Sequence, residues 1–187
     1  RLEMESDLAV RNAVIEALSE SYHTVWLIND VVTEECSLFH TDMDTVHTEA
    51  IHNALSHAKY TDTKTEYVAT MVAPEDQERM QEQISLPYIL EQFKTKRRFA
   101  VTFLRALESG PRYYRIHFGK VYMPGGRTGV TMGFIDVDDE VRRDRALEQA
   151  LAEGKKVEEE NRRLLEEMQS AARLAELMGS VSSLLTN

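Results

Sequence analysis

Histidines and aspartates crowd into one short stretch of the chain, and such side chains could bind a transition metal. The stretch contains His40, Asp42, Asp44, His47, His52 and His57. Metal sites on a helix favour two histidines four residues apart, because that spacing places both imidazoles on one face. His47, His52 and His57 are five residues apart, which turns each side chain by about 140° from the last on an α-helix. We therefore expect surface histidines and no metal site.

Motifs of enzymes are absent from the chain. It has no GxxxxGK[ST] phosphate loop, no GxSxG elbow and no Gly-Gly-Asp/Glu-Glu-Phe signature of a diguanylate cyclase. No histidine is followed by Asp or Glu, the usual pattern of a histidine-kinase phosphoacceptor. The single cysteine, Cys36, has no neighbouring cation in the sequence to lower its pKa, so we interpret it as a structural thiol. We expect no catalysis by this chain.

The strand predicted over residues 112–122 could line a binding pocket. Its side chains alternate, with Tyr114, Ile116, Phe118 and Tyr122 on one face and Tyr113, Arg115 and His117 on the other. If Tyr113, Arg115 and His117 point inward, they form a cationic pocket suited to a small acid. If they point outward, they form a rim or a dimer surface, and the pocket is apolar and filled by side chains. Periodicity leaves both alternatives open, since both faces carry aromatic residues.

The elements that must position these residues follow from hydrophobic patterning and turn residues. A helix is predicted over residues 3–20, followed by strands over 22–30 and 31–41 with a turn at Asn29-Asp30. Broken helical segments are predicted over 45–58, 61–71, 74–85 and 86–94. Three strands over 97–107, 112–123 and 130–137 close the domain. We expect an α+β fold, a five-stranded antiparallel sheet covered on one face by short helices.

The tail from residue 139 onward is predicted to be one long helix. It contains no aromatic residue, and helix formers dominate it. A 3-4 spacing runs through Leu147, Ala150, Gly154, Val157, Asn161, Leu164, Met168, Ala171, Ala175 and Met178. We expect this seam, with Val157, Asn161, Leu164 and Met168 at its centre, to form a weak parallel dimeric coiled coil, in which Asn161 pairs with its own copy. The alternative is a helix that lies along its own domain.

The segments around residues 73–80 and 136–138 resemble a known family. The run Ala73-Pro74-Glu75-Asp76-Gln77-Glu78-Arg79-Met80 is similar to the "HPDD"-type entry of the central helix in PAS domains, with Ala73 where His is usual. Asp136, Val137 and Asp138 resemble the Asp-Ile-Thr hinge where PAS domains lead into a linker helix, with Asp138 in place of Thr. The resemblance covers about residues 3–138, and residues 180–187 look like the opening of another such unit.

The resemblance implies a sensor of a bacterial signalling protein, of the histidine kinase or diguanylate cyclase type. Some PAS domains bind haem through a histidine on the central helix, but residues 74–85 contain none. Flavin photochemistry needs an Asn-Cys-Arg-like helical motif, which Cys36 lacks. Both observations argue against haem and flavin, and the sequence names no other cofactor. The chain starts at Arg1 without a leader, so we expect a fragment of a longer protein.

Composition narrows the partners. The net charge of −10 argues against nucleic acid and anionic membranes, and no apolar run is long enough to cross a bilayer. One cysteine fits a reducing compartment, so a cytoplasmic location is expected. We expect an N-terminal capping and dimerisation helix over 1–21, a sensor domain over 22–138 and a coiled-coil linker over 139–187. The expected function is a homodimeric relay to an output domain in the same chain; the alternative is a ligand-free dimerisation spacer.

Overall fold

The computed structural model describes residues 13, 15–41 and 59–187. The chain divides into two compact units, Arg1–Asp138 and Asp139–Asn187. The helix predicted over 45–58 lies outside the described residues, as do most of the helix predicted over 3–20 and all members of the histidine and aspartate stretch except His40. No helix in the described part of the chain is long and apolar enough to cross a membrane.

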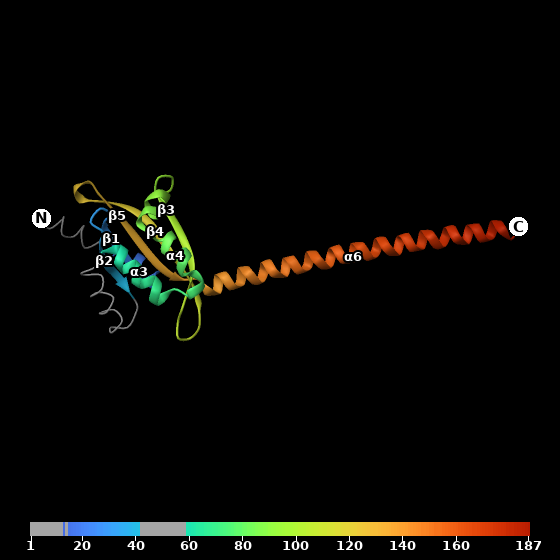
Figure 1. The fold of residues 1–187 in the computed structure, drawn as a ribbon, viewed down its shortest axis with the longest axis horizontal. Helices are drawn as coiled ribbons and strands as arrows, with labels where there is room; N and C mark the ends of the chain where they lie inside the picture. The colour runs from blue at the N-terminus through green and yellow to red at the C-terminus, as the bar shows by residue number, and fades with distance from the viewer. Residues whose placement is uncertain (1–12, 14, 42–58) are drawn as a thin grey trace. The chain divides into compact units, whose positions relative to one another are not determined.

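The first unit is built on a five-stranded antiparallel sheet, as predicted (Figure 1). Its strands are β1 (Thr24–Asp30), β2 (Glu35–Thr41), β3 (Arg98–Arg105), β4 (Arg112–Met123) and β5 (Arg127–Asp136). Their order in the sheet is β2-β1-β5-β4-β3. The N-terminal hairpin and the three-strand meander therefore join along β1 and β5, which bring the first and last strands side by side.

The turn of the N-terminal hairpin lies two residues later than predicted. Asn29 and Asp30 belong to β1, and residues 31–34 form the turn. Asp30 is buried, and its Oδ1 accepts a hydrogen bond from the backbone N–H of Val32 at 2.8 Å. This short side chain therefore closes a turn just after itself. Glu34 completes the turn at a φ of 61°, in the left-handed region.

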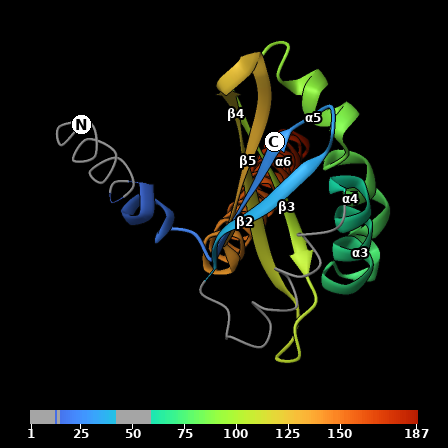
Figure 2. The same cartoon turned by 90° about the vertical axis from the view of Figure 1, so that its left-hand side faces the viewer.

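Short helices cover one face of the sheet. They are α3 (Tyr60–Met71), the 3₁₀ turn η1 (Pro74–Asp76), α4 (Gln77–Gln83) and α5 (Leu86–Gln92). Figure 2 shows α3, α4 and α5 together on one side of the sheet. Local residues start these elements: Pro74 opens η1, and Ser85 caps α5 by accepting a hydrogen bond from the Tyr88 N–H through its Oγ at 3.4 Å. A second 3₁₀ turn, η2 (Pro124–Gly126), joins β4 to β5.

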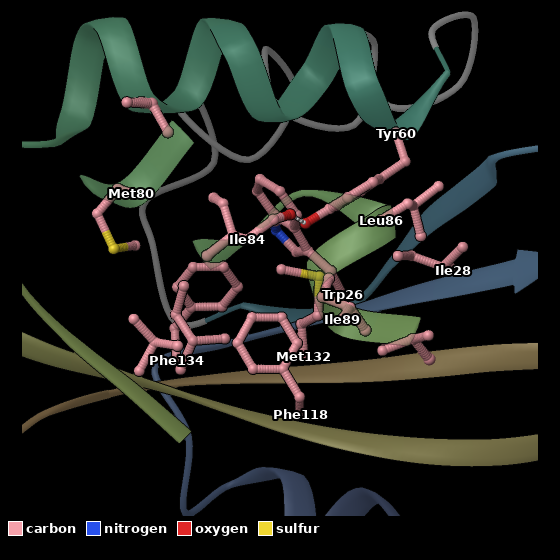
Figure 3. Packing of buried hydrophobic residues seen from close by; sticks show 14 of the residues in the cluster. Trp26, Ile28, Tyr60, Met80, Ile84, Leu86, Ile89, Phe118, Met132 and Phe134 are labelled. Carbon is pink, nitrogen blue, oxygen red and sulfur yellow. Dashed lines mark hydrogen bonds between the residues drawn. The ribbon is translucent and has the colours of Figure 1, made fainter. Parts of the chain in front are cut away.

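The core lies between the sheet and these helices (Figure 3). Alternate residues of β1, β3 and β4 point into it, so the burial of these strands follows a period of two. In β5, Val130, Met132 and Phe134 belong to the core, and the glycines Gly129 and Gly133 are buried beside them. Tyr60 reaches into the core from the start of α3, and its hydroxyl donates to the carbonyl of Ile84 at 2.6 Å. This bond satisfies a fully buried phenol and links α3 to the end of α4.

The opposite face of the sheet carries the N-terminal segment. Residues 15–19 are helical, and the Tyr22 ring that follows lies against Gly133 of β5. A Cβ at position 133 would lie 2.7 Å from two carbons of that ring, so glycine is what permits this close approach.

The second unit is a single helix. α6 runs over Asp138–Leu185, so all but its first residue belong to this unit. It agrees with the long helix predicted from the tail composition. Its apolar side chains are exposed in the single chain, among them Leu151, Leu165 and Leu174.

Candidate functional site

The structure decides which face of β4 points inward. Tyr114, Ile116 and Phe118 are buried in the core, whereas Arg115 and His117 lie on the opposite face of the sheet. Tyr113 shares that outer face by alternation. The pocket suggested for Tyr113, Arg115 and His117 between sheet and helices is therefore not formed. The physical reason is that Ile116 and Phe118 have no polar atom, so their burial is the favourable choice.

The outward side chains of β4 make polar contacts on the outer face. Arg115 Nε donates to Thr102 Oγ1 at 3.1 Å, and His117 Nδ1 lies 3.1 Å from the Tyr22 hydroxyl. A groove of about 510 Å³ opens beside this contact, between the sheet and the N-terminal segment. Its apolar wall includes Ile15 and Leu18, both exposed in the single chain.

The cation that does point inward is Arg105, the last residue of β3. It continues the inward set of Val101 and Phe103, and only 6% of it is exposed. Its guanidinium lies 4.9 Å from the centroid of the Tyr114 ring, and its Nη2 lies 3.8 Å from Met71 Sδ. Within the described chain no carboxylate pairs with Arg105. Burying a cation without an anionic partner is costly, which marks this position as exceptional.

A small cavity of about 20 Å³ lies at Arg105. It is lined by His23, Thr24, Trp26, Tyr67, Met71, Arg105 and Phe134. Figure 3 shows Trp26 and Phe134 in the core between the sheet and α3. Three of the lining residues hold a buried polar atom without a hydrogen-bond partner: Trp26 Nε1, the Tyr67 hydroxyl and Arg105 Nε. Burial raises the pKa of the Tyr67 phenol well above its ordinary value, so this hydroxyl keeps its proton.

The backbone around Arg105 is held from outside the sheet. The Ala73 N–H donates to the carbonyl of Leu104 at 2.8 Å, and the Ala106 N–H donates to the carbonyl of Met71 at 2.9 Å. Asp76 Oδ2 accepts from the Leu104 N–H at 2.7 Å. The segment matched to the helix entry of PAS domains therefore clamps the end of β3 and positions Arg105.

The residues predicted to form a hinge, Asp136, Val137 and Asp138, lie where β5 meets α6. Asp138 is 4% exposed, and its Oδ1 accepts from the Tyr113 N–H at 3.0 Å. Asp136 Oδ1 accepts from the Asp138 N–H at 2.9 Å, and Asp136 Oδ2 pairs with Arg112 Nε at 2.8 Å. The Val137 N–H donates to the carbonyl of Tyr113 at 2.9 Å. Two carboxylates therefore tie the start of β4 to the first residue of α6.

Arg105 and the hinge meet at one residue, Tyr114. The ring of Tyr114 lies under the Arg105 guanidinium, and its backbone is paired with Asp136 in the sheet. Burial raises the pKa of the Tyr114 phenol, so the ring stays neutral. Tyr114 therefore contacts Arg105 through its ring and Asp136, one of the predicted hinge residues, through its backbone.

The predicted seam residues lie along α6, on the second unit. Val157, Leu164 and Met168 are 56%, 45% and 68% exposed in the single chain, and Asn161 is exposed with them. Apolar side chains with such exposure gain stability when a partner covers them.

Two other candidates gain no chemistry from the structure. Cys36 is buried in β2, and burial raises the pKa of its thiol, which makes it less reactive. His40 lies in β2. Over residues 13, 15–41 and 59–187, no group of three or more His, Cys, Asp or Glu side chains is arranged to hold a metal ion.

Comparison with known proteins gives one consistent result. No family model and no curated protein matches the chain. Among solved structures, an RNA-binding light-oxygen-voltage receptor is 16% identical with a TM-score of 0.39, matched over 69% of this chain and only 35% of its own length. A PAS domain from a two-component sensor histidine kinase is 11% identical with a TM-score of 0.39, matched over 73% of this chain and 99% of that one.

A third similar structure is the N-terminal domain of a diguanylate cyclase with PAS/PAC sensor from Marinobacter aquaeolei. It is 16% identical with a TM-score of 0.38, matched over 63% of this chain and 96% of that one. The chain is similar in structure to PAS domains. In the first unit, Asp76 and Asp138 both use their carboxylates to hold backbone N–H groups of the sheet.

Sequence reasoning overlooked Arg105, although a signal for it was present. The alternation Val101, Phe103, Arg105 within one strand places the arginine on the apolar face. The aromatic residues on both faces of β4 drew the prediction of a cationic pocket to Arg115 instead.

Proposed function

We propose that the chain is a sensory signal-relay module. Residues 22–138 read a stimulus, the hinge at Asp136, Val137 and Asp138 passes it on, and α6 carries it to an output domain of the kinase or cyclase type. The observation that supports this best is the pair of carboxylates at the hinge. They bind the N–H groups of Tyr113 and Asp138, so a shift of β4 must act on the start of α6.

Dimerisation is part of the proposal. The seam through Val157, Asn161, Leu164 and Met168 pairs with a second copy as a parallel coiled coil, and residues 1–21 add a second contact. A helix of 48 residues whose apolar side chains are this exposed in the single chain gains stability by association. The groove beside Ile15 and Leu18 offers further apolar surface at the N-terminal end.

The test compares hinge variants in the full-length parent protein. Asp136→Ala removes the acceptor for the Asp138 N–H and the partner of Arg112, so output activity should lose its response to the stimulus while the fold remains. Asp139→Ala, next to the hinge, is the matched control and should behave as wild type. If output regulation is unchanged in Asp136→Ala at normal folded yield, the relay through this hinge is wrong.

The second candidate function is a ligand-free dimerisation spacer. The observation in its favour is the small volume of the cavity at Arg105, about 20 Å³. The two functions differ in one simple measurement, native mass spectrometry of the purified chain. A bound small molecule favours the sensor, and a spacer has none.

A further inference from the structure

We propose that Arg105, Tyr67 and Trp26 form a binding site for a small monocarboxylate anion. The idea that this anion is the stimulus depends on the proposed sensory function. The binding of the anion is independent of that function, because the three residues of the site belong to the sheet and α3 alone. The experiment below measures binding and is therefore separate from any test of relay.

Each of the three unpartnered atoms at this cavity can donate a hydrogen bond. The indole Nε1 of Trp26 and the Nε of Arg105 can only donate, and the Tyr67 hydroxyl, protonated at neutral pH, donates as well. A water molecule accepts two hydrogen bonds, whereas a carboxylate offers about four lone-pair sites. An anionic acceptor is therefore the complement of this set.

The charge of Arg105 points to the same ligand. The Tyr114 ring and Met71 Sδ, which contact its guanidinium, are both neutral. The hinge carboxylate Asp136 is already paired with Arg112 at 2.8 Å. A cation–π contact compensates a buried charge only in part, because it is weaker than the cost of burying an uncompensated ion. An anion at Arg105 would supply the missing charge.

Cavity size restricts the class of ligand. About 20 Å³ holds one water molecule with little to spare. Met71 lines the cavity, and an unbranched thioether adapts its rotamer easily. We therefore expect formate to require a movement of Met71 and acetate a larger one, and we expect a bulky dicarboxylate to be excluded by the rings of Trp26 and Phe134.

Trp26 reports on binding directly, because it is the single tryptophan of the chain and lines the cavity. The experiment titrates the purified chain with sodium formate and sodium acetate in the millimolar range. Ionic strength is held constant with sodium sulfate, and Trp26 emission and the unfolding temperature are recorded. We expect saturable changes in emission and a rising unfolding temperature with formate and acetate.

Matched variants locate the site. Arg105→Gln removes the charge, and Tyr67→Phe removes one donor while keeping the ring. Arg115→Gln makes the same charge change on the outer face of the sheet. We expect Arg105→Gln to weaken formate binding more than about tenfold, as for a lost hydrogen bond to a charged group. Tyr67→Phe should weaken it several-fold, and Arg115→Gln should leave it unchanged.

Three outcomes would overturn the proposal. First, if formate and acetate change the emission of wild type no more than sulfate does, the cavity holds only water. Second, if sodium chloride alone saturates the change in Trp26 emission, the carboxylate class is excluded. Third, if Arg115→Gln weakens formate binding as much as Tyr67→Phe does, the anion binds outside the cavity at Arg105. If Arg105→Gln does not fold, the comparison of Tyr67→Phe with Arg115→Gln still decides between these results.

Discussion

The buried carboxylate of Asp138 accepts a hydrogen bond from the backbone N–H of Tyr113 at 3.0 Å, across 25 residues of sequence. This contact joins the first residue of α6 to the second residue of β4. It also places the start of the helix one residue from Tyr114, the residue that lies under Arg105.

Removing this carboxylate should loosen the start of β4. Asp138→Ala leaves the Tyr113 N–H without this acceptor in a partly buried place, so we expect a loss of about 1–3 kcal/mol in the free energy of unfolding. Urea denaturation measures the loss, and amide hydrogen exchange at Tyr113 localises it. Asp139→Ala is the control, with little change expected. Unaltered exchange at Tyr113 in Asp138→Ala would show that the bond does not hold the strand.

Acid should weaken the contact between Glu34 and the start of α3. Glu34 Oε2 accepts from the Thr61 N–H at 2.9 Å, and hydrogen bonds from Thr61 hold the pKa of Glu34 below its ordinary value of 4.5. A pKa lowered in the folded state stabilises the fold above 4.5, and this contribution is lost as the pH falls through the folded pKa. At pH 7 we expect the free energy of unfolding of wild type to be about 0.3–1 kcal/mol larger than that of Glu34→Gln.

The difference between wild type and Glu34→Gln should shrink as the pH falls below 4.5, where protonation makes the two side chains alike. Urea denaturation at stepped pH values measures it. Glu35→Gln, on the neighbouring residue, is the control. A difference that stays constant down to strongly acidic pH would contradict a role for the charge of Glu34.

Cys36 should react with thiol reagents only when the chain unfolds. It is 5% exposed, and burial raises the pKa of its thiol, so little thiolate is present or accessible in the native state. Because the chain has one cysteine, a chromogenic disulfide reagent reports on this site alone. We expect slow reaction in buffer and rapid reaction in urea. Rapid modification of the native chain would assign Cys36 a reactive role.

Association through α6 should respond to Asn161. An asparagine at a seam position fixes register at a cost in stability, so Asn161→Leu should tighten a dimer more than about tenfold. Glu159→Leu adds a similar apolar side chain on the opposite face of the helix and should change association little. Sedimentation equilibrium measures both. Equal effects of the two variants, or a wild-type mass that stays near 21.4 kDa at high concentration, would rule out this seam.

Sequence patterning captured the elements whose signals are local. Turn residues and alternation located β4 and β5, and Pro74 with its following acids located the entry to α4. The first hairpin turn was displaced because Val31 and Val32 are β-branched and favour strand. What overruled them is the short carboxylate of Asp30, which bonds its own turn.

The site was harder to predict because its members are far apart in sequence. Trp26, Tyr67 and Arg105 lie on β1, α3 and β3, and only the packing of the helices on the sheet brings them to one cavity. Trp26 and Tyr67 are residue types that are common in a core, and only the charge of Arg105 is unusual there. The proposed hinge, by contrast, rests on a local signal, because Asp136 and Asp138 are two residues apart and bonded to each other.

The clamp on β3 has a consequence for how copies of this chain can meet. β3 is an edge strand, and an uncovered edge offers free N–H and C=O groups to strands of other molecules. At its end, Ala73 and Asp76 already occupy the outward groups of Leu104, and Met71 occupies the N–H of Ala106. Sheet-to-sheet polymerisation is therefore blocked along this stretch, and an assembly of the chain has to use its other surfaces.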